Sequence, residues 1–453
     1  MVSAKSIPHV AFLAFPFGTH ASPLFSLARA LAADDPSTAF TFFNSARSNS
    51  SLLQSLPSGL PPNLRTFDVP DNVPEGAWLP PEEVRLFLEV TPENFLETMA
   101  AAEREFGRVT CVVGDAFFWF AGDVAAERGA SWVALWTGGP CSLAAHLYTD
   151  LLRDTFGVED QALARANDLL DIIPGLQSLR VGDLPEGVVF GNIKSAFADL
   201  LHQMGQKLPH ATCVVINTPD GLNPELDLDF QAKFKKCLNV GPLSHLFPQP
   251  LDPEKHGCLA WLDTQIEASV VYISFGTVIM PSSQDLIEMA AGLEASGVPF
   301  LWSLKDMARK HLPEGFLDRV AGRGLVVPWA PQTQVLGHLA VGAFLTHCGW
   351  NSILESISSG VPLICRPFFG DQCLNAKTVS CVWKIGVAFE SRAIEKEDMV
   401  RVLNVVLKTE EGKKMREKAD KLKTTALQAT KPGGNSIKNF DTLVKMIVGN
   451  HGS

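Results

Sequence analysis

The sequence predicts an α/β protein built from parallel sheets, and three observations carry this prediction. Apolar runs of strand length alternate with segments of helical periodicity along the whole chain, which is the pattern of βαβ units. The runs are apolar throughout, as expected for strands that are covered on both faces. The alternation stops once, near residues 239–258, and then starts again, so we expect two similar halves.

Five strands are predicted in the first half, at residues 10–15, 40–43, 109–113, 132–136 and 213–216. Between the first two, residues 20–33 carry Leu24, Leu27, Ala28 and Leu31 at helical spacing. This spacing predicts a helix that packs its apolar side on the sheet. The second half repeats the pattern, with strands at 269–275, 299–304, 325–327, 341–346 and 362–365, a helix at 284–296 and a charged helical tail at 410–423.

The break between the halves contains four prolines and two glycines, which disfavour regular elements. We therefore predict an N-terminal domain at 1–243, a linker at 244–257 and a C-terminal domain at 258–435. A last helix at 436–453 is expected to pack back on the N-terminal domain. Two such domains would face each other across a cleft at the carboxyl ends of their sheets, where ligands of these folds bind.

Composition excludes several classes of function. The 453 residues carry a formal net charge of −11, which argues against binding to nucleic acid or to an anionic membrane. No apolar run reaches the roughly 18 residues of a membrane helix, and the run near the start is short and is interrupted by Pro16, unlike a signal peptide. Nine cysteines without a CxxC pair predict neither a disulfide framework nor a zinc site. We expect a cytoplasmic, monomeric protein that acts on small molecules.

Common nucleotide and hydrolase motifs are missing from the sequence. It contains no GxGxxG, no GxxxxGK and no GxSxG, so the local patterns of nicotinamide, ATP and serine-hydrolase chemistry are absent. Asp227 and Asp229 have the spacing that can hold a divalent metal on a nucleotide sugar. Because they lie in a Leu-rich and Pro-rich segment without further ligands, we expect no metal site there.

The segment from Trp329 to Gln372 is the most informative part of the chain, and it reads WAPQTQVLGHLAVGAFLTHCGWNSILESISSGVPLICRPFFGDQ. Its predicted strand ends at His347 and turns through a glycine into a helix that opens near Asn351. The unpaired N–H groups and the positive dipole end of such a helix form a site for a phosphate. The alternative is that Ser352 and Glu355 only form an S-x-x-E capping box.

All 44 residues of this segment closely resemble the signature segment of plant family-1 UDP-glycosyltransferases. The resemblance implies a GT-B architecture, in which two Rossmann-like domains face a cleft. It implies UDP-glucose as a co-substrate, no cofactor, no metal and a single inverting displacement. It also implies the residues that contact the UDP-sugar, and these are Thr19, Thr277, Trp329, Ala330, Gln332, His347, Trp350, Asn351, Ser352, Glu355, Asp371 and Gln372.

Each implied contact has a chemical role. Trp329 would stack on the uracil ring, while the Ala330 backbone and Gln332 would read the base and the ribose. Glu355 would accept hydrogen bonds from the ribose hydroxyls. The diphosphate would be held by Thr277, His347, Asn351 and Ser352, and the sugar by Trp350, Asp371 and Gln372. In this family a terminal Gln usually accompanies glucose, so Gln372 favours UDP-glucose. For Thr277, an ordinary turn residue at a strand end is the alternative.

A catalytic pair is predicted in the N-terminal half. His20 follows the first strand, and Asp115 follows the third strand among several aromatic residues, where burying an unpaired carboxylate would be costly. A pair of the two would explain both positions. The imidazole would take the proton of the acceptor hydroxyl, and the carboxylate would orient the ring and stabilise the imidazolium. The family resemblance assigns the same roles.

The N-terminal half is similar to flavonoid 3-O-glucosyltransferases in FPFGTH, DNVPEG, DAFFWFAGDVAAE and LWTGGPCSLAAH. This implies a flavonol or anthocyanidin as the acceptor, bound by Phe17, Phe117, Trp136, Thr137, His146 and Phe368, although core packing is the alternative for each aromatic residue. Pro81 and Pro185 lie where relatives can carry polar side chains. Another small phenol as acceptor, or a non-catalytic binding protein, remains an alternative, but the His20 and Asp115 pair counts against the second.

Overall fold

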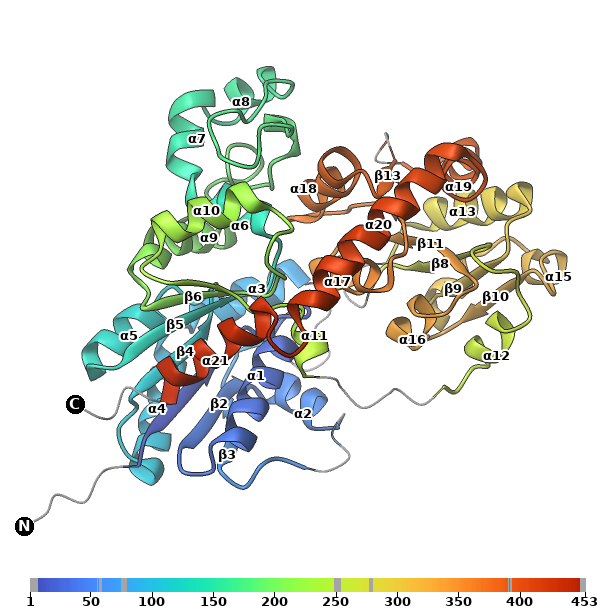
Figure 1. The fold of residues 1–453 in the computed structure, drawn as a ribbon. Helices are drawn as coiled ribbons and strands as arrows, with labels where there is room; N and C mark the ends of the chain where they lie inside the picture. The colour runs from blue at the N-terminus through green and yellow to red at the C-terminus, as the bar shows by residue number, and fades with distance from the viewer. Residues whose placement is uncertain are drawn as a thin grey trace, which may run out of the picture.

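The computed structural model describes residues 7–54, 56, 59–74, 80–247, 254–276, 280–389, 391 and 393–448. It contains two sheets in which every strand pair is parallel, and helices cover both sheets (Figure 1). The predicted α/β class with two Rossmann-like domains is therefore confirmed.

The first sheet has seven strands in the order β3-β2-β1-β4-β5-β6-β7. Their bounds are β1 His9–Leu13, β2 Ala39–Ser45, β3 Leu64–Val69, β4 Cys111–Asp115, β5 Ser131–Trp136, β6 Cys213–Ile216 and β7 Cys237–Asn239. The five predicted strands correspond to β1, β2, β4, β5 and β6. The two edge strands were not predicted, because β3 is partly exposed and β7 has only three residues.

The second sheet has six strands in the order β10-β9-β8-β11-β12-β13. Their bounds are β8 Val270–Ser274, β9 Phe300–Ser303, β10 Gly324–Val327, β11 Val341–Thr346, β12 Leu363–Cys365 and β13 Gly386–Ala388. Five of them were predicted, and the missed strand is again a three-residue edge strand, β13. A strand this short offers no period to recognise.

Helices flank each sheet. Those around the first sheet are α1 Ala21–Asp34, α2 Ala46–Gln54, α3 Pro80–Glu89, α4 Glu93–Phe106, α5 Ala121–Arg128, α6 Pro140–Leu147, α7 Thr149–Phe156, α8 Asp160–Ala164, α9 Ala196–Lys207, α10 Pro224–Lys233 and α11 Leu243–Leu246. Those of the second half are α12 Cys258–Leu262, α13 Ser283–Ser296, α14 Asp306–Arg309, α15 Phe316–Arg319, α16 Gln332–Leu336, α17 Trp350–Ser359, α18 Gln372–Lys377, α19 Lys396–Lys408, α20 Glu410–Ala429 and α21 Asn435–Val448. A π-helical segment, Thr378–Trp383, directly continues α18.

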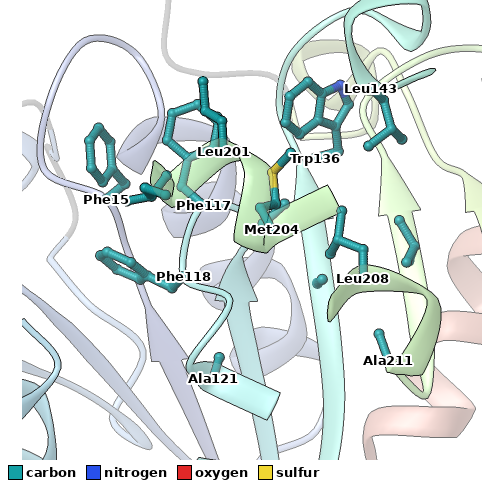
Figure 2. Packing of buried hydrophobic residues seen from close by; sticks show 14 of the residues in the cluster. Phe15, Phe117, Phe118, Ala121, Trp136, Leu143, Leu201, Met204, Leu208 and Ala211 are labelled. Carbon is teal, nitrogen blue, oxygen red and sulfur yellow. The ribbon is translucent and has the colours of Figure 1, made fainter. Parts of the chain in front are cut away.

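The core of the first half gathers aromatic side chains under the cleft. Phe15, Phe117 and Phe118 belong to one apolar cluster that also contains Trp136 and Met204. Figure 2 shows Met204 of α9 pointing toward Trp136, with the phenylalanines beside it. Helix α1 packs on the opposite face through Leu24, Leu27, Ala28 and Leu31, as its periodicity predicts. The cluster fixes the backbone from which the site residues project.

The chain returns to the first half at its end. Helix α20 runs from the second domain toward α21, which lies over the first sheet (Figure 1). Ser436 Oγ donates to the carbonyl of Gly241 at 2.6 Å, and Asn439 Nδ2 donates to the carbonyl of Asn239 at 2.9 Å. Leu443 and Ile447 join an apolar cluster of the first sheet.

The stretch predicted to lack regular elements is partly regular. Strand β7 ends at Asn239, and α11 covers Leu243–Leu246, where a side-chain carbonyl of Asn217 accepts from the Leu243 amide at 2.9 Å. Buried Leu243 anchors this helical turn. The expectation of an irregular chain was therefore wrong for these residues, and residues 248–253 lie outside the described part of the chain.

Candidate active site

Each sheet has one point at which its strand order reverses. This point lies between β1 and β4 in the first sheet and between β8 and β11 in the second. Neighbouring loops leave the sheet in opposite directions there, so a crevice opens at the carboxyl ends of the strands. His20 follows β1 and Asp115 ends β4, while Ser274 ends β8 and His347 follows β11. The predicted catalytic and diphosphate residues thus lie at equivalent places of the two sheets.

His20 and Asp115 form the predicted pair. The Nδ1 atom of His20 lies 2.9 Å from Asp115 Oδ2 and 3.1 Å from Thr137 Oγ1. The other carboxylate oxygen of Asp115 accepts from the Phe117 amide at 3.0 Å. The carboxylate is 1% exposed and the imidazole 24%. Because a carboxylate only accepts, Nδ1 carries the proton, and Nε2 is left with a lone pair that can take a second one.

The charge environment raises the pKa of His20. Burial lowers the pKa of His20, but the carboxylate of Asp115 outweighs it through charge and a hydrogen bond, and Asp371 of the second domain adds to the effect. The net result is a pKa raised above the ordinary value of 6.5. A raised pKa means that the ring holds a proton more tightly, as a general base at neutral pH requires.

Aromatic rings surround the imidazole. The ring centroid of Phe117 lies 4.4 Å from that of His20, and the Phe15 centroid lies 5.3 Å away. Trp136 continues the cluster at 5.9 Å from Phe117, and His146 follows at 6.2 Å from Trp136. Burial lowers the pKa of His146 to about 4, so it is a neutral ring near neutral pH. These residues form an apolar wall beside the base.

Two exposed aromatic side chains, one beside Phe117 and one beside Gln372, were not among the predicted site residues. Phe197 of α9 is 39% exposed and lies edge-on to Phe117 at 5.7 Å. Phe369 is 48% exposed, and its amide donates to Gln372 Oε1 at 3.3 Å. Isolated phenylalanines give no pattern in the sequence, so only their exposure in the folded chain identifies them as candidate contacts. Phe17 lies further along the same wall, with its ring 5.3 Å from Phe15.

Phe368, a predicted acceptor contact, lies apart from the aromatic cluster of His20. Its ring lies 5.6 Å from Phe275 and under the guanidinium of Arg366, with 4.6 Å from Cζ to the ring centroid. It therefore packs within the second domain and not in the aromatic cluster of His20. Pro185 is buried, so it presents no surface for hydroxyl recognition. The Pro81 side chain lies outside the described residues.

The diphosphate end of the site is built around the start of α17. Gly349 caps this helix, and Cys348 before it has a positive φ of 66°. Gly276 and Gly349 enclose the His347 ring so closely that a Cβ on them would lie 3.0 and 2.4 Å from ring atoms. Burial lowers the pKa of His347 to about 4. The first turn of α17 and the neutral imidazole of His347 therefore lie close together, where both can donate hydrogen bonds to a phosphate.

The capping-box alternative is wrong. The cap of α17 is Gly349, and Ser352 is already the third helical residue. Ser352 Oγ and Glu355 Oε2 instead accept from Gln332 Nε2 at 3.1 and 2.5 Å. The Gln332 carbonyl in turn accepts from Tyr272 at 3.1 Å. Burial raises the pKa of Glu355, although the bond from Gln332 opposes the shift. The network holds three predicted donor-site side chains together.

The base and sugar ends flank this network. Trp329 follows β10 and keeps 40% of its surface exposed, while Ala330 behind it is 4% exposed. An exposed indole on a buried support is suited to stacking. At the other end, Asn375 Nδ2 donates to Asp371 Oδ2 at 2.9 Å, and burial raises the pKa of Asp371. Gln372 Oε1 accepts from the Phe368 amide at 2.9 Å, which leaves its N–H groups to donate.

For four other predicted residues, the structure supports less than the full predicted contact. The indole of Trp350 is 5% exposed and donates to the carbonyl of Asn217 at 2.8 Å, so a sugar contact could come only from its backbone. Thr19 is exposed in the loop before α1, and Asn351 is half-buried in the first turn of α17. Thr277 lies outside the described residues.

The two aspartates with metal-like spacing have separate partners. Asp227 Oδ1 accepts from Asn239 Nδ2 at 2.8 Å, and Asp229 Oδ1 accepts from the Tyr148 hydroxyl at 2.7 Å. Within the described ranges, no group of three or more His, Cys, Asp or Glu side chains could hold a metal ion. In the same part of the chain, no helix combines the length and apolarity needed to span a bilayer.

Two Rossmann-like domains, with a His–Asp pair at one strand-order reversal and a helix N-terminus at the other, are the architecture of a GT-B glycosyltransferase. The chain belongs to the UDP-glucoronosyl and UDP-glucosyl transferase family, whose model matches residues 81–424. It is therefore a UDP-glycosyltransferase.

Known proteins resemble the chain over its whole length. A flavonol 3-O-glucosyltransferase of Arabidopsis thaliana is 51% identical over 447 residues, which are 97% of each protein. An anthocyanidin 3-O-galactosyltransferase of Actinidia chinensis var. chinensis is 48% identical, over 100% of this chain and 99% of its own. The crystal structure of a UDP-glucose:anthocyanidin 3-O-glucosyltransferase in complex with UDP superposes with a TM-score of 0.92 at 39% identity, covering 99% of this chain and 100% of that one.

Proposed function

We propose that the protein transfers glucose from UDP-glucose to the 3-hydroxyl of a flavonol or an anthocyanidin. The main support for the transfer reaction is the 2.9 Å hydrogen bond between His20 and Asp115 at the first strand-order reversal. The acceptor class rests on the similarity to flavonol and anthocyanidin 3-O-glycosyltransferases and on the aromatic wall of Phe117 and Trp136 beside the base.

The reaction is a single displacement. His20 Nε2 takes the proton of the acceptor hydroxyl while its oxygen bonds to the anomeric carbon, and the bond from that carbon to the diphosphate oxygen breaks. Asp115 stabilises the imidazolium that forms. The attack comes from the face opposite the leaving group, so the anomeric configuration inverts and no covalent enzyme intermediate forms.

The leaving diphosphate is stabilised without a metal. The amides of the first turn of α17, the neutral His347 ring and the hydroxyl of Ser352 supply donors and a positive dipole end. The segment from Trp329 to Gln372 contains no lysine and a single arginine, Arg366, which faces Asp285 at 3.6 Å. We propose that Trp329, Gln332 and Glu355 hold the uridine, with no cofactor.

The last two residues of the signature segment, Asp371 and Gln372, indicate which sugar is transferred. Gln372 and Asp371 lie side by side at the start of α18, where an amide and a carboxylate suit adjacent hydroxyls. Gln372 favours glucose, and galactose is the competing sugar because one relative is a galactosyltransferase. The protein would act as a monomer in the cytoplasm, with domains at 1–243 and 258–435.

Product analysis tests the proposal. The protein is incubated with a flavonol or an anthocyanidin and with UDP-glucose or UDP-galactose, and the new glycosidic bond is located by mass spectrometry and NMR. The expected product is a β-linked 3-O-glucoside, formed faster than the galactoside. Glucosylation only of other phenols would support the alternative acceptor, and UDP-sugar binding without any transfer would support a binding protein.

A further inference from the structure

A second groove lies outside the predicted donor and catalytic residues. It has a volume of about 750 Å³ and is lined by the ends of β12 and β13, the π-helical segment, α19 and α20, with Gly182 and Asp183 from the first domain. Of the predicted site residues, only Phe368 lines it. A volume of this size is typical of small-molecule sites, which range from about 300 to 1,000 Å³.

The groove is strongly cationic. We call it the basic groove, after its six cationic side chains, Arg366, Lys377, Lys384, Arg401, Lys414 and Lys418. Among the described residues, the acidic side chains that line it are Asp183 and Glu411. The whole chain has the opposite balance, with a formal net charge of −11. A concave surface that concentrates cations on an acidic protein creates a local field that attracts anions.

Half of these cations are held by acidic partners. Lys377 lies 3.8 Å from Asp183, and Arg401 lies 2.8 Å from Asp398. Arg366, which is 8% exposed, faces Asp285 at 3.6 Å. These contacts fix the walls of the groove.

The other three cations are available to a ligand. Lys384, Lys414 and Lys418 have no ion pair within the described residues. Lys384 follows the π-helical segment with a positive φ of 56°, while Lys414 and Lys418 are one turn apart on α20. Two separate elements thus bring unpaired ammonium groups to one cavity. All three side chains are exposed, and their convergence on one concave surface creates a positive potential that attracts anions.

The floor of the groove is apolar. Phe389 and Met415 are 8% and 6% exposed, and the Arg366 guanidinium lies over the Phe368 ring, with Cζ 4.6 Å from the ring centroid. Single π-helical turns occur often at functional sites, and this one places Ser380 and Lys384 on the same cavity. The groove therefore combines apolar side chains at its floor with exposed ammonium groups at its rim.

We propose that the basic groove binds a small polyanion with a di- or triphosphate group, at a site separate from that of UDP. Lys384 approaches it from the π-helical side and the two lysines of α20 from the other. The phosphate oxygens replace water around the ammonium groups, which are strong but orientation-tolerant donors. Binding there is independent of the acceptor and of the transfer reaction.

Calorimetry with inorganic tripolyphosphate tests the proposal. The full chain is titrated with and without saturating UDP, which occupies the donor site. We expect saturable binding in both cases, weakening as salt rises. The variant K384Q/K414Q/K418Q should bind tripolyphosphate at least about tenfold more weakly, since each lost phosphate contact removes a charge-assisted hydrogen bond. It should bind UDP like the unmodified protein, which shows that it is folded.

A matched variant separates the groove from net charge. K255Q/K310Q/K438Q removes the same charge from three exposed lysines that do not line the groove. It should bind tripolyphosphate like the unmodified protein. Loss of tripolyphosphate binding in the presence of UDP would overturn the proposal, because the anion would then occupy the donor site. Equal weakening in the two triple variants would also overturn it, because only the overall charge would matter.

Discussion

The two strand-order reversals have the same topology but opposite electrostatics. At the first, a buried carboxylate and an imidazole with a raised pKa form a hydrogen-bonded pair. At the second, the imidazole of His347 has a pKa lowered to about 4 and adjoins helix amides. In the proposed reaction the first imidazole accepts a proton, so it needs a charged partner that stabilises the imidazolium. The second must hold an anion that later leaves, and neutral donors do so without the cost of burying a cation.

The largest effect is expected from His20→Ala, which removes the base from the first reversal only. The value of kcat should fall by a factor of about 10² to 10⁴, the usual contribution of a general base. The dissociation constant of UDP should stay within about twofold. Steady-state kinetics and calorimetry measure the two quantities. His347→Ala is the matched change at the second reversal, and it should weaken UDP binding instead.

Much of this comparison could be predicted from the sequence. The roles of His20 and Asp115 follow from their positions after two strands, because parallel strands end at one edge of a sheet. The sequence could not distinguish the protonation of the two histidines, because burial and the glycines around His347 decide it. It also could not show that Phe368 packs on Phe275 while Phe369 is exposed, because the folded loop decides how two neighbouring phenylalanines are turned.

The next largest effect is expected from Asp115→Asn. The side-chain amide introduced by this substitution can donate to Nδ1 of His20. It would then favour the tautomer in which Nε2 already carries the proton. We expect kcat to fall by a factor on the order of 10² or more, by analogy with the orienting Asp of hydrolase triads. The pH profile gives a second readout. Because His20 acts unprotonated, kcat/KM rises with pH through its pKa, and loss of Asp115 should move that rise to lower pH.

An unchanged pH profile together with a large loss of kcat would show that Asp115 orients the ring without tuning its charge. Thr137→Val is a matched control. It removes the other group near Nδ1, at 3.1 Å, without removing charge. It should leave the position of the pH rise nearly unchanged.

A smaller effect is expected from Trp329→Leu at the second reversal. Losing a base–aromatic contact costs about 1 to 3 kcal/mol, which corresponds to roughly a 5- to 150-fold increase in KM for UDP-glucose at similar kcat. Trp350→Phe is the control, because its indole is buried and donates to Asn217. Trp350→Phe should lower the thermal stability of the protein more than it lowers the affinity for UDP-glucose. Steady-state kinetics and thermal unfolding separate the two outcomes, and a kcat effect of Trp329→Leu without a KM effect would contradict the stacking role.

The smallest effect is expected from Asp371→Asn, because Asp371 acts from the second domain on the pKa of His20 at the first reversal. Asp371 belongs to the second domain, yet its charge raises the pKa of His20, after the larger contribution of Asp115. Asp371→Asn should therefore move the rise of kcat/KM to lower pH, by less than Asp115→Asn does. Asp371→Glu retains the charge and should restore its position. The pH profile is the proper readout because Asp371 is also proposed to hold the sugar, so the rate alone would not distinguish the roles. A shift larger than that of Asp115→Asn would mean that the second domain sets the base strength, with the two domains acting as one site.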